Sequence, residues 1–99
     1  MLKIDDKVKF KMFDNEYTVH ACNDRYAICV DESSAEQFYS IVDNKHSIRG
    51  THNSYGHSTT SREECEEVLT LLSDETNELD ISQRNNVPLD IEAINGQRV

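Results

Sequence analysis

Three of the four histidines lie close together in one polar segment of the chain. His46, His52 and His57 fall within residues 44–58, directly after Asp43. Imidazole and carboxylate groups are common zinc ligands. The spacings match no compact ligand pair, however, and ordering a segment of this length around an ion costs conformational entropy. We therefore expect solvated histidines and no metal or other cofactor, with a zinc site formed by these three histidines as the weaker alternative.

No other residue pattern indicates a catalytic centre. The sequence contains no nucleophile elbow, no phosphate-binding loop and no dinucleotide-binding glycine motif. Its paired glutamates, at positions 63–64 and 66–67, are better explained as water-exposed positions in the first turns of a helix. We predict that the protein is not an enzyme and has no catalytic residues. If it is an enzyme, the histidine segment 44–58 is the expected site.

Three arginines stand beside residues that favour turns. Arg25, Arg49 and Arg84 each have an asparagine or a glycine within two positions. Arginine in such places commonly ties backbone carbonyls or carboxylates together, and it can also hold a phosphate or carboxylate ligand. We favour the structural role. The alternative is a protein that binds and sequesters a nucleotide-like anion with these arginines.

Negative charge is concentrated in the second half of the chain. The 99 residues hold 19 acidic and 10 basic side chains, a net charge of −9, and residues 51–99 hold 10 acidic and 3 basic ones. This excess argues against direct binding of nucleic acid or of an anionic membrane, because both select a basic surface. It favours instead a partner protein with a basic surface. The candidate contacts are four glutamates of a predicted helix: Glu63, Glu64, Glu66 and Glu67.

The first half of the chain has the patterns of short strands. Residues 7–12 alternate charged and apolar side chains, residues 16–21 resume the alternation after a turn signal, and residues 26–30 and 38–43 are rich in apolar residues. Short turns between successive strands favour an antiparallel meander. Residues 44–58 have neither period, so we expect a long loop there.

An amphipathic helix is predicted after this loop. A capping residue, Thr60 or Ser61, stands three positions before a glutamate. Apolar residues then recur at helical spacing and form one stripe. The stripe consists of Cys65, Val68, Leu69 and Leu72. We expect the helix to end near residues 73–76 and to pack this stripe on the sheet.

These elements predict an α+β fold, an antiparallel meander of four or five strands with one helix packed on it. A small SH3-like barrel is the alternative. We expect one domain over residues 1–92, extended segments at 79–81 and 87–91, and a frayed tail at 93–99. The three cysteines, an odd number without C-x-x-C spacing, are expected to be reduced and buried. No apolar run has the length of a membrane span, and the first residues lack the features of a signal peptide.

Several motifs, in order along the chain, resemble those of small uncharacterised proteins of tailed bacteriophages. They are NDRYAI at 23–28, YSIVD at 39–43, IRG at 48–50, the acidic helix, and ISQRNNVPLDI at 81–91. The resemblance covers residues 16–92. It implies a phage gene product made in the cytoplasm of the host bacterium. It implies no established activity, so no residue inherits a catalytic role.

Taken together, these observations predict a small acidic phage protein that binds and modulates or inhibits a host protein without catalysis. An anti-phage defence nuclease, a polymerase or a signalling enzyme are candidate targets. Besides the anion-sequestering alternative, the helix carboxylates could imitate DNA phosphates and so occupy the basic cleft of a target. The sequence leaves the identity of the target and the oligomeric state open, a homodimer included.

Overall fold

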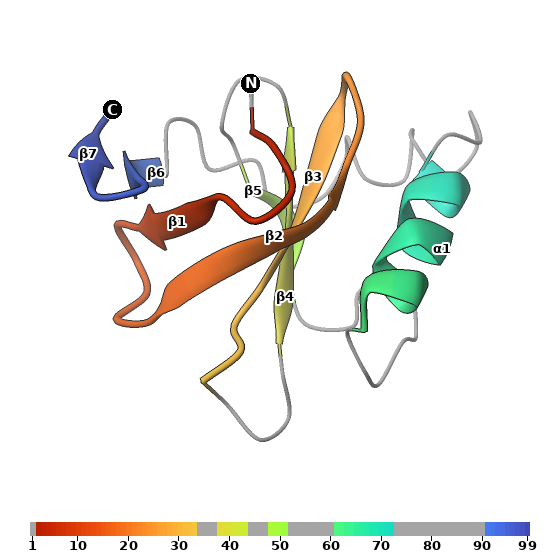
Figure 1. The fold of residues 1–99 in the computed structure, drawn as a ribbon, viewed down its shortest axis with the longest axis horizontal. Coiled ribbons are helices and arrows are strands. Elements are labelled where there is room, and N and C mark those ends of the chain that lie inside the picture. The colour runs from red at the N-terminus through yellow and green to blue at the C-terminus, as the bar shows by residue number, and fades with distance from the viewer. Residues whose placement is uncertain (1, 34–37, 44–47, 52–60, 73–90) are drawn as a thin grey trace.

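The computed structural model describes residues 2–33, 38–43, 48–51, 61–72 and 91–99 of the chain. These residues form one antiparallel sheet and one helix. The elements in chain order are β1 (Lys7–Phe10), β2 (Glu16–Cys22), β3 (Tyr26–Val30), β4 (Tyr39–Asp43), β5 (Ile48–Thr51), α1 (Arg62–Leu72), β6 (Ile91–Ile94) and β7 (Gln97–Arg98). Helix α1 packs against β2 and β3 at one side of the molecule, and the β6–β7 hairpin lies at the opposite side (Figure 1).

The seven strands lie in the order β5-β4-β3-β2-β1-β6-β7, and every neighbouring pair is antiparallel. The first five strands follow one another along the chain as a meander, and β6 pairs with the outer side of β1. The predicted α+β class, an antiparallel sheet with one helix packed on it, is therefore confirmed. Among the described residues, this order ends at β5 on one side and at β7 on the other.

Two segments differ from the prediction, and together they bring the number of strands above four or five. The sequence predicts a loop over 44–58, but β5 lies within that range and pairs with β4. The sequence also predicts a frayed tail at 93–99, but this segment forms the end of β6 and all of β7, with Ala93 opposite Arg98. Both predictions are wrong for these residues. The predicted strand residues 79–81 and 87–90 lie outside the described residues.

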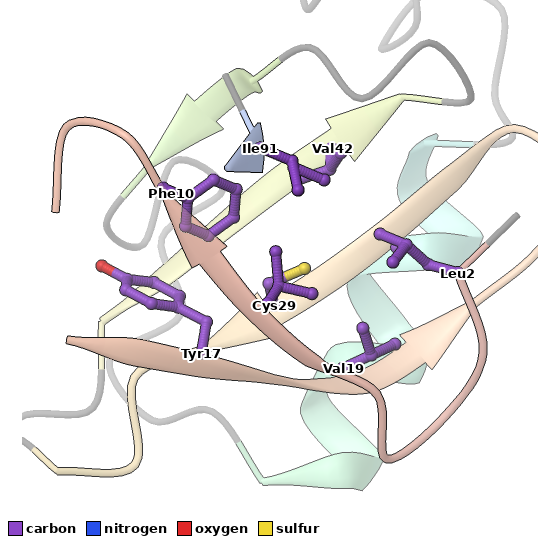
Figure 2. Packing of buried hydrophobic residues seen from close by; sticks show 9 residues of the cluster. Leu2, Phe10, Tyr17, Val19, Cys29, Val42 and Ile91 are labelled. Carbon is purple, nitrogen blue, oxygen red and sulfur yellow. The ribbon is translucent and has the colours of Figure 1, made fainter. Parts of the chain in front are cut away.

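Apolar side chains pack on both faces of the sheet. The cluster on one face is shown in Figure 2 and consists of Leu2, Val8, Phe10, Tyr17, Val19, Ala27, Cys29, Val42 and Ile91. The cluster between the other face and α1 consists of Ala21, Ile28, Val30, Tyr39, Ile41, Cys65, Val68, Leu69 and Leu72. Successive residues of β3 alternate between the two clusters. This explains why residues 26–30 are almost continuously apolar, as is usual for a strand buried on both faces.

Ser61 is the residue that caps α1. Its hydroxyl oxygen accepts a hydrogen bond from the backbone N–H of Glu64 at 3.3 Å, and its carbonyl accepts one from Cys65 N at 3.0 Å. Of the two predicted capping registers, the structure therefore adopts the one that begins at Ser61. A cap of this kind stabilises a helix by about 1 kcal/mol. The cap fixes the residue at which the helix begins, and Glu63, in the first turn, is exposed to solvent.

Candidate functional site

Helix α1 is fixed to the sheet by one side and exposes the other. Cys65, Val68, Leu69 and Leu72 are buried, as the helical spacing predicts. Full burial of a valine or leucine side chain stabilises the fold by about 1.5–3 kcal/mol, so the helix is anchored firmly. The exposed side carries three glutamates, Glu63, Glu66 and Glu67, which we call the acidic helix face. The fourth candidate, Glu64, is only partly exposed.

Within the described segments, no basic side chain forms an ion pair with the acidic helix face. The cation of the helix itself, Arg62, pairs with Asp5 instead. The last turn of the helix contains no basic residue. Burial is the main reason why the pKa of the Cys65 thiol is raised to about 12; Glu64 and Glu66 add to the rise, and Arg62 opposes it. The exposed side of α1 thus presents three glutamates that form no ion pair with a basic side chain of the described segments.

Two of the three candidate arginines are at the same end of the sheet. Arg25 is exposed in the turn between β2 and β3, with its guanidinium carbon 5.8 Å from the centre of the Tyr26 ring. Tyr26 is opposite Asp43, the last residue of β4, and β5 begins beside that end of β4. Arg49 follows the first residue of β5, so its backbone lies toward the same end. The third arginine, Arg84, lies outside the described residues.

The histidines with the predicted metal-ligand chemistry, His46, His52 and His57, all lie outside the described residues. Among the residues that are described, no group of three or more His, Cys, Asp or Glu side chains could hold a metal ion. All three cysteines are described and carry free thiols. Cys29 and Cys65 are buried, as predicted, whereas Cys22 is half-buried.

One buried histidine, in β2, was not among the candidate site residues predicted from the sequence. His20 is 8% exposed, and its Nε2 lies 2.5 Å from Oε1 of Glu32, just after β3. This hydrogen bond lowers the pKa of the Glu32 carboxyl. A histidine within a predicted strand was the only signal for the pair, and nothing in the sequence indicates its partner. The pair ties β2 to the segment that follows β3.

The chain has no match among protein-family models, curated proteins or solved structures. The resemblance to phage proteins therefore stays a prediction, and function has to be argued from the surface itself. No described helix is long and apolar enough to cross a membrane.

Proposed function

We propose that this chain is a small, non-catalytic phage protein that binds a basic surface of a host protein and modulates or inhibits it. The contact surface is the acidic helix face, and the host bacterial cytoplasm is where the encounter takes place. The observation that carries the proposal is the placement of Glu63, Glu66 and Glu67 on the exposed side of a helix whose other side is buried in the core. A rigid helix holds these carboxylates in a fixed pattern before any partner arrives.

The spacing of the three glutamates favours a cationic partner. Glu63 stands three residues before Glu66 and four before Glu67, so the three side chains are neighbours on the helix surface. Like charges at these spacings destabilise a helix by about 0.2–0.5 kcal/mol per pair. A partner that brings lysine or arginine side chains between them removes this repulsion. Complementary charge also raises the rate of association and makes binding sensitive to salt.

The experiment is affinity capture from bacterial host lysate with two matched variants. The first variant changes all three glutamates of the acidic helix face to glutamine, which keeps a good helix former at each position. The second removes the same amount of charge elsewhere, with Glu16→Gln, Asp24→Asn and Glu92→Gln. We expect one stoichiometric host protein to be retained by the wild type and by the second variant, and to be lost with the first.

Two results would contradict the proposal. One is that no host protein is retained under several buffer conditions. The other is that the captured protein binds the helix variant as tightly as the wild type, which would place the contact elsewhere. Where a partner is captured, competition with duplex DNA tells whether the glutamates occupy a nucleic-acid site, and a lower affinity at high salt is expected in either case.

A further inference from the structure

A hollow of about 400 Å³ opens beside the turn between β1 and β2. This volume lies within the range of small-molecule binding sites, about 300–1,000 Å³. Its described lining combines apolar side chains with carboxylates; Lys9, which is not part of that lining, donates from its ammonium group to the backbone oxygen of the lining residue Phe13. The apolar part is formed by Met12, Phe13, Tyr17 and Phe38, and the carboxylates are Asp14 and Asp31.

Asp31 is the chemically distinctive residue of this hollow. It is only 5% exposed, although aspartate is seldom buried. The backbone N–H and the hydroxyl of Ser33 donate to Oδ1 at 3.0 and 2.5 Å, and the Asn15 side-chain amide donates to Oδ2 at 3.1 Å. The backbone N–H of Asp31 also donates to Phe38 O at 2.8 Å. These donors hold the Asp31 carboxyl group in a defined position in the wall of the hollow.

The aromatic part of the hollow is equally well fixed. The rings of Phe13 and Tyr17 are stacked, with centroids 5.5 Å apart and planes 19° apart. Phe10 packs edge-on against both, at 5.7 Å and 5.0 Å. Burial raises the pKa of Tyr17, and the charge of Asp31 raises it further. Phe13, Tyr17 and Asp31 all line the hollow.

We propose that this hollow binds the ammonium group of an alkylamine or arylalkylamine, with Asp31 and Asp14 facing the charge and the rings of Phe13 and Phe38 contacting the apolar substituent. A carboxylate in a partly desolvated site pairs well with an ammonium group and repels an anion. Aromatic rings add cation–π attraction as well as apolar contact. The ammonium group can belong to a free amine or to a lysine side chain. The inference does not rest on the proposed function, because it uses none of the residues of the acidic helix face.

The first test uses three probes of similar shape and different charge. Benzylamine, benzyl alcohol and benzoate are titrated into the ¹⁵N-labelled wild-type protein at pH 7 and constant ionic strength, and binding is followed by amide chemical shifts. We expect benzylamine to bind at least about tenfold more tightly than benzyl alcohol, a difference of about 1.4 kcal/mol. The shifts should lie at residues 12–17 and at Asp31. Equal binding of the alcohol, tighter binding of benzoate, or shifts centred elsewhere would overturn the proposal.

Variants then test which carboxylate is responsible. Asp31→Asn should weaken benzylamine binding about tenfold, as expected for loss of a charge-assisted contact. Because Asp31 is buried and this variant can unfold, Asp14→Asn provides a second measurement at an exposed position, where about a threefold loss is expected. Asp24→Asn, an exposed carboxylate in the β2–β3 turn, is the control and should bind like the wild type. Unchanged binding by folded Asp14→Asn and Asp31→Asn would refute the assignment.

A final comparison distinguishes the two sources of the ammonium group. Butylamine and Nα-acetyl-lysine methylamide carry the same alkylammonium group, with and without a peptide backbone. Tighter binding of the lysine derivative assigns the hollow to a lysine side chain, and tighter binding of butylamine assigns it to free amines. If neither compound binds, the proposal is wrong.

Discussion

The turn between β6 and β7 offers a stability prediction that can be worked out atom by atom. Asn95 and Gly96 form this two-residue connection and both have positive φ angles, 52° and 82°. The side-chain oxygen of Asn95 accepts a hydrogen bond from Lys7 N at 2.8 Å, and its side-chain nitrogen donates one to Asp6 Oδ1 at 3.0 Å. The backbone N–H of Asn95 donates to Lys7 O at 2.7 Å. One residue thus both shapes the hairpin and fastens it to the start of β1.

The cost of Asn95→Ala has two separable parts. Loss of the two side-chain hydrogen bonds costs about 0.5–1.5 kcal/mol each, and the lower half of that range applies because both are exposed. Placing an alanine in the left-handed region costs a further amount of about 1 kcal/mol. We therefore expect Asn95→Ala to lower the free energy of unfolding by about 2–3 kcal/mol. Glycine tolerates the positive φ, so Asn95→Gly loses only the two side-chain hydrogen bonds. This variant should lower the free energy of unfolding by about 1–2 kcal/mol.

Urea denaturation followed by far-ultraviolet circular dichroism measures these differences, since the chain contains no tryptophan for fluorescence. Gln97→Ala, an exposed position in β7, is the control and should stay within about 0.5 kcal/mol of the wild type. The reasoning is refuted if Asn95→Ala also stays within that margin. If the alanine and glycine variants are equally destabilised, the cost assigned to the left-handed backbone conformation is refuted, and the cost assigned to the hydrogen bonds is not.

Two further predictions concern titratable side chains. The hydrogen bond from His20 lowers the folded-state pKa of Glu32, so its contribution to stability is present above the ordinary value of 4.5 and is lost as the pH falls through the lowered pKa. The difference in unfolding free energy between wild type and Glu32→Gln should therefore shrink between pH 5 and strongly acidic pH, and a constant difference would contradict this. Burial raises the pKa of all three thiols. Cys22 is the most accessible of the three to solvent, because it is only half-buried. Ellman's reagent should accordingly modify Cys22 slowly in the native protein, and Cys29 and Cys65 only on unfolding; rapid reaction of all three would show that the core is open.

Helix α1 and the strands β1 to β4 were predictable because their signals are local. The four buried residues of α1 are those that the helical spacing picks out, and the cap lies at one of the two predicted positions. Alternation over residues 7–12 indicates β1, although the strand ends at Phe10. The acidic helix face was predictable for the same reason, since the exposed glutamates are those opposite the apolar stripe.

The remaining elements and the hollow were not predictable because they depend on pairing between distant segments. β5 contains a glycine and shows no apolar alternation, and its strand conformation comes from pairing with β4. β7 has only two residues, both exposed, and is held by β6. The hollow draws its lining from residues 12–15 before β2, from Tyr17 within β2, and from Asp31 and Phe38, which follow β3 and precede β4. In the sequence, Asp31 is an ordinary polar residue after a predicted strand. Only the structure shows that Asn15 and Ser33 donate hydrogen bonds to its carboxyl group.

The curvature of the sheet has the same origin. Three strand pairs shift register, leaving His20 in β2, Arg49 in β5 and Glu92 in β6 as extra residues. A β-bulge bends its strand and increases the local twist. Three bulges in one sheet favour a curvature that brings distant strands together. Val42 of β4 and Ile91 of β6 share one cluster although three strands separate them in the sheet order (Figure 2).

The bulge at His20 also decides which face of the sheet each side chain joins. Val19 and Ala21 are two residues apart and would share a face in a regular strand. Because His20 is the extra residue between them, Val19 joins the cluster of Figure 2 and Ala21 joins the cluster under α1. The β2–β3 register passes from Val19 to Ala21 and skips His20, whose ring contacts Glu32 beyond the end of β3. A period-of-two reading of residues 16–21 assigns Ala21 to the wrong face, because the bulge is a property of the pairing with β3 and not of the β2 sequence alone.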